Sequence, residues 1–219
     1  MSASAVLVSE ADVHARAEAL ADRIAVFRRL LHRNGPPPLW RREASFATLV
    51  RLVLEQQVSL ASAQAAFVRL EARVGDVTPS AVLGSTPEEL RSDGFSRQKD
   101  RYVRGIAGAI EAGEFEPPLP GEDVDSARDR LLGLTGIGPW TAACYLLFAL
   151  GAPDVWPRGD RALHVAMADA MDLPEPPGSD QAEAMAHAWS PDRSTAARFL
   201  WHDYLGGRSY TQTPASGFR

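Results

Sequence analysis

The chain has 219 residues, of which 45% are hydrophobic and 23% charged, and its formal net charge is −5. This is enough apolar material for one large domain or for two small lobes that share a core. No apolar run approaches the roughly 20 residues of a membrane span. The first residues lack a signal peptide's basic and then apolar pattern, so we expect a cytoplasmic protein with no membrane partner.

Cysteine occurs once, at Cys144. One cysteine excludes an internal disulfide, a cysteine-rich zinc site and a four-cysteine iron–sulfur cluster. The negative net charge argues mildly against nucleic acid as a partner, unless the positive charges gather on one face.

Helical spacing of apolar residues predicts a first helix over residues 9–33, broken by the Gly/Pro-rich stretch 34–38. A second apolar face over residues 46–54 predicts another helix, which ends near Gln56 and Gln57. Ser59 is placed to cap a third helix over residues 60–73. By themselves, the two glutamines are most simply read as a helix end in solvent.

A turn at residues 85–88 combines a capping residue with proline and predicts a short helix. The next helix starts near Arg97 and also carries Lys99, Arg101 and Arg104. These four cations are either a solvated face or phosphate contacts, and the sequence alone leaves both readings open.

Residues 126–132 and 139–150 are predicted to form two helices joined by the tight loop 134–138. In this loop Gly136 and Gly138 are expected at positions that need positive φ and close backbone approach. Pro139 suits the first turn of the second helix, where its missing N–H costs nothing. The loop should therefore direct several N–H groups outward, as an anion site suited to a phosphate.

Asp160 follows this second helix after a Pro/Gly-rich turn, 20 residues beyond Trp140. Aspartate is a favourable cap for a helix that begins at Arg161. Further helices are expected over 163–171, 180–189 and 192–205, and residues 206–219 are expected to form a mobile tail.

The motif GIGPWTA, followed by Asp160 at this spacing, closely resembles the helix-hairpin-helix DNA glycosylases. LEQQVSLASA, GFSRQKDRYV and the PDRS and LW pairs near the C-terminus resemble the type II 3-methyladenine DNA glycosylases within that superfamily. The resemblance covers about residues 39–205. It does not include the additional N-terminal β-domain of longer bacterial members, so the chain resembles a short form.

The resemblance implies an all-α fold: two helical lobes around a cleft, with the helix-hairpin-helix motif followed by a Gly/Pro-rich loop and the aspartate. Residues 1–219 would form a single domain. One lobe would contain 43–116, the other 1–42 and 122–205, and 206–219 would be the tail.

The implied activity is that of a monofunctional DNA glycosylase in base excision repair. Such an enzyme flips an alkylated purine, for example 3-methyladenine or 7-methylguanine, out of damaged double-stranded DNA. It then hydrolyses the N-glycosidic bond and leaves an abasic site. Asp160 would stabilise the oxocarbenium character of the sugar. Trp140 would stack on the cationic base in the pocket, unless it is a core residue beneath the hairpin.

The resemblance also implies a set of DNA contacts. Gln57 would be the wedge that fills the gap left by the flipped nucleotide, with Gln56 beside it, and the hairpin would contribute Gly136, Gly138 and Thr141. Bifunctional relatives place a lysine for Schiff-base attack where this chain has Trp140, so lyase activity is not expected.

No cofactor is expected to be required. Relatives bind a monovalent cation, Na⁺ or K⁺, through hairpin carbonyl groups, and the corresponding residues here are Leu132, Leu134 and Ile137. The cysteine count rules out the iron–sulfur cluster that some relatives carry. The protein is expected to be a monomer.

One departure from the resemblance concerns Asp192, where a relative has a tryptophan that faces the base pocket. A wider or differently selective pocket is the expected consequence. Arg193 and Trp201 are more simply read as a pair that packs the last helix on the core. Two alternative functions therefore stay open: a glycosylase of the same fold for deaminated or oxidised bases, and a non-catalytic hairpin module that only binds DNA.

Overall fold

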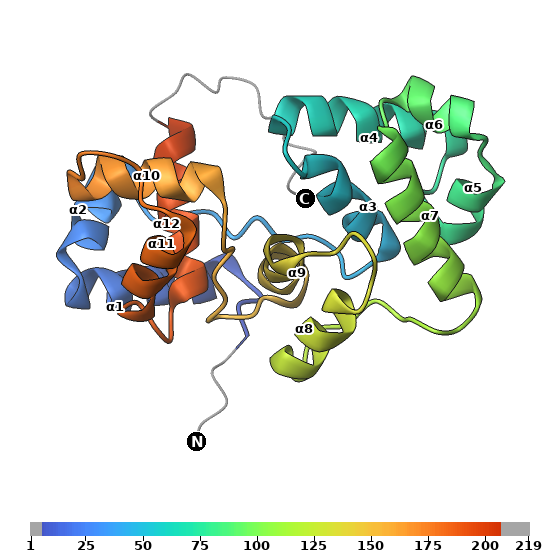
Figure 1. Cartoon of the computed structure of the whole chain (residues 1–219). Coiled ribbons are helices and arrows are strands. Elements are labelled where there is room, and N and C mark those ends of the chain that lie inside the picture. Colours follow the sequence, from blue (N-terminus) through green and yellow to red (C-terminus); the bar gives the residue numbers. More distant parts are fainter. Residues whose placement is uncertain (1–5, 207–219) are drawn as a thin grey trace. The chain divides into compact units, whose positions relative to one another are not determined.

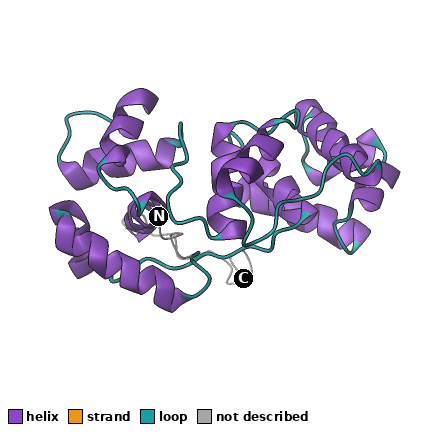
Figure 2. Ribbon diagram, turned by 90° about the horizontal axis from the view of Figure 1, so that it is seen from below, coloured by secondary structure: helices purple, strands orange, loops and turns teal. Residues whose placement is uncertain are grey.

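The computed structural model describes residues 6–206, and within this range every regular element is a helix (Figures 1 and 2). The predicted all-α class is confirmed. The described residues form two compact units: the terminal unit, residues 6–41 with 146–206, and the central unit, residues 42–145. Of the expected tail, residues 207–219 lie outside the described range. None of the described helices is both long and apolar enough to cross a membrane.

The terminal unit is built around its last helix, α12, which packs against the four other α-helices of the unit. Eight consecutive residues of α12, from Ser194 to Trp201, are buried. The helices of this unit are α1 Glu10–Arg23, α2 Ala25–Asn34, the π-helical segment η1 Leu146–Leu150, α10 Arg161–Met171, α11 Ser179–His187 and α12 Arg193–Gly206.

The single helix predicted over residues 9–33 was wrong in one respect, because the chain breaks at Ile24. This residue has an extended backbone, φ −127° and ψ 114°, and it ends α1 and begins α2. The break lets α1 and α2 pack on each other as separate helices. Each then buries its own apolar face, α1 through residues such as Leu20 and α2 through Phe27 and Leu30.

The central unit is organised around α3, seven of whose ten residues are buried and which packs against α4, α7 and α9. Predicted caps are confirmed here: Ser59 Oγ accepts from Ser62 N, and Thr86 and Glu89 form a capping box. The helices of this unit are α3 Phe46–Glu55, α4 Leu60–Val74, α5 Pro79–Gly84, α6 Pro87–Asp93, α7 Arg97–Glu111, α8 Val124–Leu132 and α9 Pro139–Tyr145.

The division into units differs from the expected lobes at residues 122–145, which belong to the central unit. The physical reason is that both hairpin helices are tied to this unit. Helix α9 packs on α3 and α8, and the buried hydroxyl of Tyr145 donates to the carbonyl of Pro118 at 3.1 Å.

Candidate functional site

The hairpin turn joins α8 to α9 and closes on a backbone hydrogen bond from Ile137 N to Leu134 O, 3.1 Å long. Gly136 has φ +95°, as its position in the turn predicted. Gly138 was expected to share a positive φ, and that prediction was wrong. An added Cβ at Gly138 would have nothing within 4 Å, so this face of the turn is open to an approaching ligand.

Gly136 lies directly on the ring of Tyr102 from α7. A Cβ built on Gly136 would stand 2.3 Å from Cγ of that ring and 2.6 and 2.7 Å from the two Cδ atoms. The tyrosine is held in turn by Gln98, whose Nε2 donates to its hydroxyl at 2.6 Å. Glycine is therefore required at residue 136 for two reasons. Its φ is positive, and the Tyr102 ring leaves no room for a Cβ atom.

We expect Gly136→Ala to lower the free energy of unfolding by about 2–4 kcal/mol, because it adds backbone strain to an overpacked contact. Chemical denaturation measures this loss. Gly138→Ala is the matched control: its stability should stay within about 0.5 kcal/mol of the parent. Equal stability loss in both variants would contradict the close contact between residue 136 and Tyr102.

Gln56 does not point into solvent. Its Nε2 donates to the carbonyl of Gly136 at 2.9 Å and to the hydroxyl of Thr141 at 3.0 Å. Thr141 is only 2% exposed. The side chains of Gln56 and Thr141, both expected to contact DNA, are therefore engaged within the central unit and hold the hairpin in shape.

The hairpin also has backbone amides without a partner among residues 6–206. Within the described part of the chain, no acceptor is recorded for the N–H groups of Gly136, Gly138 or Thr141. Amides of this kind can bind a phosphate oxygen without reading base sequence. These amides are compatible with the predicted anion site, which stays a prediction; the Thr141 hydroxyl is already engaged by Gln56.

Gln57 behaves differently from its neighbour. It has φ +57°, a left-handed conformation that is uncommon for a residue other than glycine, and its side chain is exposed. The same turn between α3 and α4 exposes two large apolar residues, Val58 at 45% and Leu60 at 41%. This turn is thus exposed on the central unit, as a wedge would require, and the role of Gln57 there stays a prediction.

Trp140 is the second residue of α9 and is half-buried. It is neither a fully enclosed core residue nor a freely exposed one, and its expected role in the base pocket stays a prediction.

No lysine lies on the hairpin, since the single lysine, Lys99, is on α7. Its Nζ donates to the carbonyl of Leu54 at 2.6 Å and so caps the end of α3.

Asp160 is the N-cap of α10, as predicted: its Oδ1 accepts from Leu163 N at 2.8 Å. The same oxygen lies 3.3 Å from Nε1 of Trp201 on α12, which donates to it. The residue is partly exposed. A carboxylate fixed by a helix N-terminus and an indole, and still accessible, has the placement that catalysis by a carboxylate requires.

Trp201 was expected only to pack α12 on the core, and its contact with Asp160 was missed. Its indole also stacks on Phe148 of the π-helical segment, with ring centroids 5.4 Å apart and 24° between the planes. The two residues of the Asp160–Trp201 bond are 41 apart in sequence. No local spacing rule joins them, and the LW pair within the resemblance was the only available signal.

His164, one turn beyond Asp160, was also not foreseen. Its Nε2 is buried and has no hydrogen-bond partner among the described residues. Burial lowers the pKa of this imidazole, against the opposing effect of Asp160. With its pKa held below the ordinary value, the ring is mainly neutral at pH 7.

The family model for HhH-GPD superfamily base excision DNA repair proteins matches residues 50–191, about two thirds of the chain. The chain belongs to this superfamily. Its matched region contains the hairpin, the glutamine turn and Asp160.

Two members of the superfamily illustrate the degree of sequence similarity. The chain is 27% identical over 184 residues to the putative DNA-3-methyladenine glycosylase YfjP of Bacillus subtilis, covering 78% of this chain and 63% of that protein. It is 26% identical over 178 residues to DNA-3-methyladenine glycosylase 1 of Schizosaccharomyces pombe, covering 79% and 78%. The chain thus spans less than two thirds of the Bacillus relative.

The solved structure of the Schizosaccharomyces pombe 3-methyladenine DNA glycosylase in complex with abasic DNA superposes with a TM-score of 0.72. The sequences are 25% identical, and the match covers 85% of this chain and 94% of that one. The likeness supports the all-helical fold of the superfamily.

Asp192 is a buried ion-pair partner in the terminal unit. It is only 6% exposed and accepts from Arg16 Nη1 and Arg23 Nη2 of α1, both at 2.6 Å. This double ion pair holds α1 to the start of α12, and the expected wider or differently selective pocket stays a prediction. The neighbouring Arg193 bonds Asp154 through its Nε at 2.8 Å, a structural role as predicted.

The cations of α7 divide into two groups. Lys99 and Arg104 are structural: Arg104 pairs with Asp100 at 2.5 Å and donates to the carbonyl of Ser85 at 2.7 Å. Arg97 and Arg101 are exposed. Two of the four cations of the expected basic cluster therefore stabilise the fold, and the other two remain on the surface.

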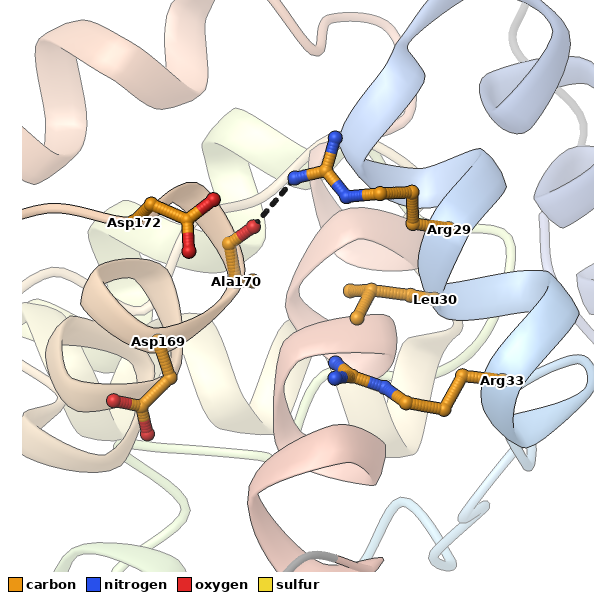
Figure 3. A pocket seen from close by; sticks show the side chains of 6 residues that line it. All are labelled: Arg29, Leu30, Arg33, Asp169, Ala170 and Asp172. Atoms are coloured by element: carbon orange, nitrogen blue, oxygen red, sulfur yellow. Dashed lines mark hydrogen bonds between the residues drawn. The ribbon is translucent and has the colours of Figure 1, made fainter.

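A pocket in the terminal unit is lined by residues of α2 and of the end of α10 (Figure 3). Its two arginines are already engaged, Arg29 with the carbonyl of Ala170 at 2.8 Å and Arg33 with Asp203 at 2.7 Å. Within residues 6–206 no cluster of three or more His, Cys, Asp or Glu side chains could hold a metal ion.

Proposed function

We propose that this protein is a monofunctional DNA glycosylase that removes alkylated purines, such as 3-methyladenine and 7-methylguanine, from damaged double-stranded DNA. The observation that carries the proposal is the fixed yet accessible carboxylate of Asp160 in a chain with a superfamily hairpin. The names of the relatives from Bacillus subtilis and Schizosaccharomyces pombe support alkylated bases as the substrates.

In this proposal the hairpin binds the DNA strand through its backbone. The amides of Gly136, Gly138 and Thr141 bind phosphate oxygens, which positions the strand without specifying a sequence. Gln57, at the tip of its turn, fills the gap left by the everted nucleotide. Filling that gap offsets part of the unstacking free energy of a few kcal/mol that base flipping costs.

The chemistry exploits the positive charge of an N-alkylated purine, which makes the base a good leaving group. As the glycosidic bond breaks, positive charge develops on the sugar, and the Asp160 carboxylate stabilises it. The same carboxylate is placed to orient or deprotonate the attacking water. The face of Trp140 attracts the cationic base by stacking, worth about 0.5–2 kcal/mol.

A monovalent cation, Na⁺ or K⁺, is proposed at the carbonyl groups of Leu132, Leu134 and Ile137. The proposal is supported by the Leu134 carbonyl, which accepts one bond from Ile137 N and keeps a second lone pair for an ion. An ion there would tighten the turn and offset phosphate charge. We further propose that the protein acts as a cytoplasmic monomer and needs no iron–sulfur cluster.

A substrate panel tests the proposed function. Duplexes that each carry 3-methyladenine, 7-methylguanine, ethenoadenine, hypoxanthine or uracil are incubated with the protein, and the released base is quantified. We expect release of the two methylpurines above the level of an Asp160→Asn variant. Release of uracil or hypoxanthine alone would assign the deaminated-base alternative, and no release from any duplex would favour a DNA-binding module.

We expect no covalent adduct when the protein and damaged duplex are treated with borohydride. A lyase needs an amine to form the Schiff base that borohydride reduces, and the position for it on the hairpin is Trp140. Gel electrophoresis of the treated mixture measures the adduct. A known bifunctional glycosylase serves as the positive control, and a stable protein–DNA band here would contradict the monofunctional assignment.

A further inference from the structure

The side chain of Gln56 links two parts of the central unit that are far apart in sequence. It lies at the end of α3, where the exposed turn with Gln57 begins. Its carboxamide reaches Gly136 and Thr141, 80 and 85 residues further along the chain. Gln56 therefore joins the base of the turn, to which it belongs, to the hairpin.

The two partners of Gln56 are residues whose backbone amides are proposed to bind phosphate oxygens. The carboxamide holds the carbonyl of Gly136 at 2.9 Å and the hydroxyl of Thr141 at 3.0 Å, while the N–H groups of the same two residues have no acceptor among the described residues. Holding the inner side of each residue limits the directions in which its N–H can point.

Other contacts make this link rigid. Lys99 Nζ caps the end of α3 at the carbonyl of Leu54, two residues before Gln56. Tyr102 supports Gly136 from beneath, and Gln98 fixes its ring. The end of α3 and the hairpin are thus both braced by α7, and Gln56 is the side chain that joins them directly.

We propose that Gln56 is a positioning residue that couples the Gln57 turn to the hairpin, so that binding of the strand and filling of the vacated base position occur together. The inference rests on the proposed function and deepens it. Gln56 contacts no DNA in this scheme. It acts through Gly136 and Thr141 on one side and through the adjacent Gln57 on the other.

A purely structural role for Gln56 predicts a different effect of its removal on stability, binding and base displacement. Removing it would then lower stability and leave the folded fraction fully competent in binding and base displacement. A positioning role predicts that the folded variant has lost ordering of the hairpin amides. It also predicts that Gln57 no longer contributes to base displacement once Gln56 is replaced.

The first experiment uses the free protein and needs no substrate. Amide order parameters of Gly136 and Thr141 are measured by ¹⁵N relaxation in the parent and in Gln56→Leu, Thr141→Val and Gln181→Leu. Gln181 is exposed on α11 and provides a matched glutamine-to-leucine control. We expect both order parameters to fall in Gln56→Leu, the Gly136 value to fall less in Thr141→Val, and neither to change in Gln181→Leu.

The second experiment uses a duplex with an abasic-site analogue and a neighbouring 2-aminopurine, whose fluorescence rises when the base position beside it is disturbed. Gln56→Leu should weaken binding about tenfold, the loss of roughly one net hydrogen bond. It should also abolish the fluorescence rise, as Gln57→Ala does. The Gln56→Leu/Gln57→Ala double variant should be no worse than Gln56→Leu alone.

The outcomes of these experiments distinguish failure of the inference about Gln56 from failure of the proposed function. Unchanged order parameters, with binding within twofold of the parent, would overturn the role of Gln56 whatever the lesion range. Additive effects of the two glutamine substitutions on fluorescence would overturn the coupling. A parent protein that shows the coupling and releases no alkylated base would instead overturn the proposed function alone. If Gln56→Leu does not fold, Thr141→Val decides the first experiment.

Discussion

Asp160→Asn is expected to lower the single-turnover rate of methylpurine release by about 10²–10³-fold. Asparagine keeps the shape of the side chain but removes the negative charge that stabilises the developing cation on the sugar. It should not disturb the fold, because asparagine caps helices as well as aspartate does. Its amide oxygen can still accept from Leu163 N and from Trp201 Nε1, as Asp160 Oδ1 does.

The measurement is a single-turnover assay in which alkali cleaves the strand at each new abasic site. Binding to a duplex with an abasic-site analogue should stay within about threefold of the parent, since the hairpin is unaltered. Asp123→Asn is the matched control, because Asp123 caps α8 in the same way through its bond from Ser126 N at 2.9 Å. An Asp160→Asn variant with undiminished release would remove the basis of the proposed mechanism.

The largest loss of stability is expected from Arg198→Met. Arg198 is 0% exposed, and its guanidinium donates to the carbonyls of Leu39, Leu147 and Ser194 at 3.0, 3.1 and 3.4 Å. Burial lowers the pKa of this group to about 9, still well above neutral pH, so the group remains charged. Methionine would leave these carbonyls without their donor, at an expected cost of about 3–5 kcal/mol.

Chemical denaturation of the parent and variant at pH 7 measures this loss. Arg198→Lys should recover little of it, because one ammonium cannot reproduce the forked geometry of a guanidinium. Arg33→Met is the matched control at an exposed ion pair, with a side chain 58% exposed, and should cost less than about 1 kcal/mol. A midpoint for Arg198→Met equal to that of the control would refute a structural role for the buried arginine.

Local features were predictable because their causes lie within a few residues. The caps at Ser59, Thr86 and Asp160 depend on a side-chain oxygen that accepts a backbone N–H two or three residues ahead. The turn at Gly136 depends on a conformation that only glycine adopts easily. Motifs of this kind also carried the resemblance to the superfamily, which the family model confirms.

Long-range contacts decided the roles that sequence reasoning assigned wrongly or missed. Gln56 and Gln57 are identical neighbours, yet one is turned inward to Gly136 and the other is exposed. Asp192 is a buried partner of two arginines of α1. In each case the deciding partner lies 80 or more residues away, at a distance where chain spacing carries no information about contact.

The amino-acid sequence alone was sufficient to predict most of the helices, the hairpin and the capping position of Asp160, because each follows from backbone conformation and hydrogen bonding between near neighbours. Tertiary packing alone determines which oxygen, ring or amide each side chain meets, as with Trp201 at Asp160 and Arg198 among buried carbonyls. Those partners are brought together only when apolar helix faces are buried against one another, and that burial depends on the whole chain.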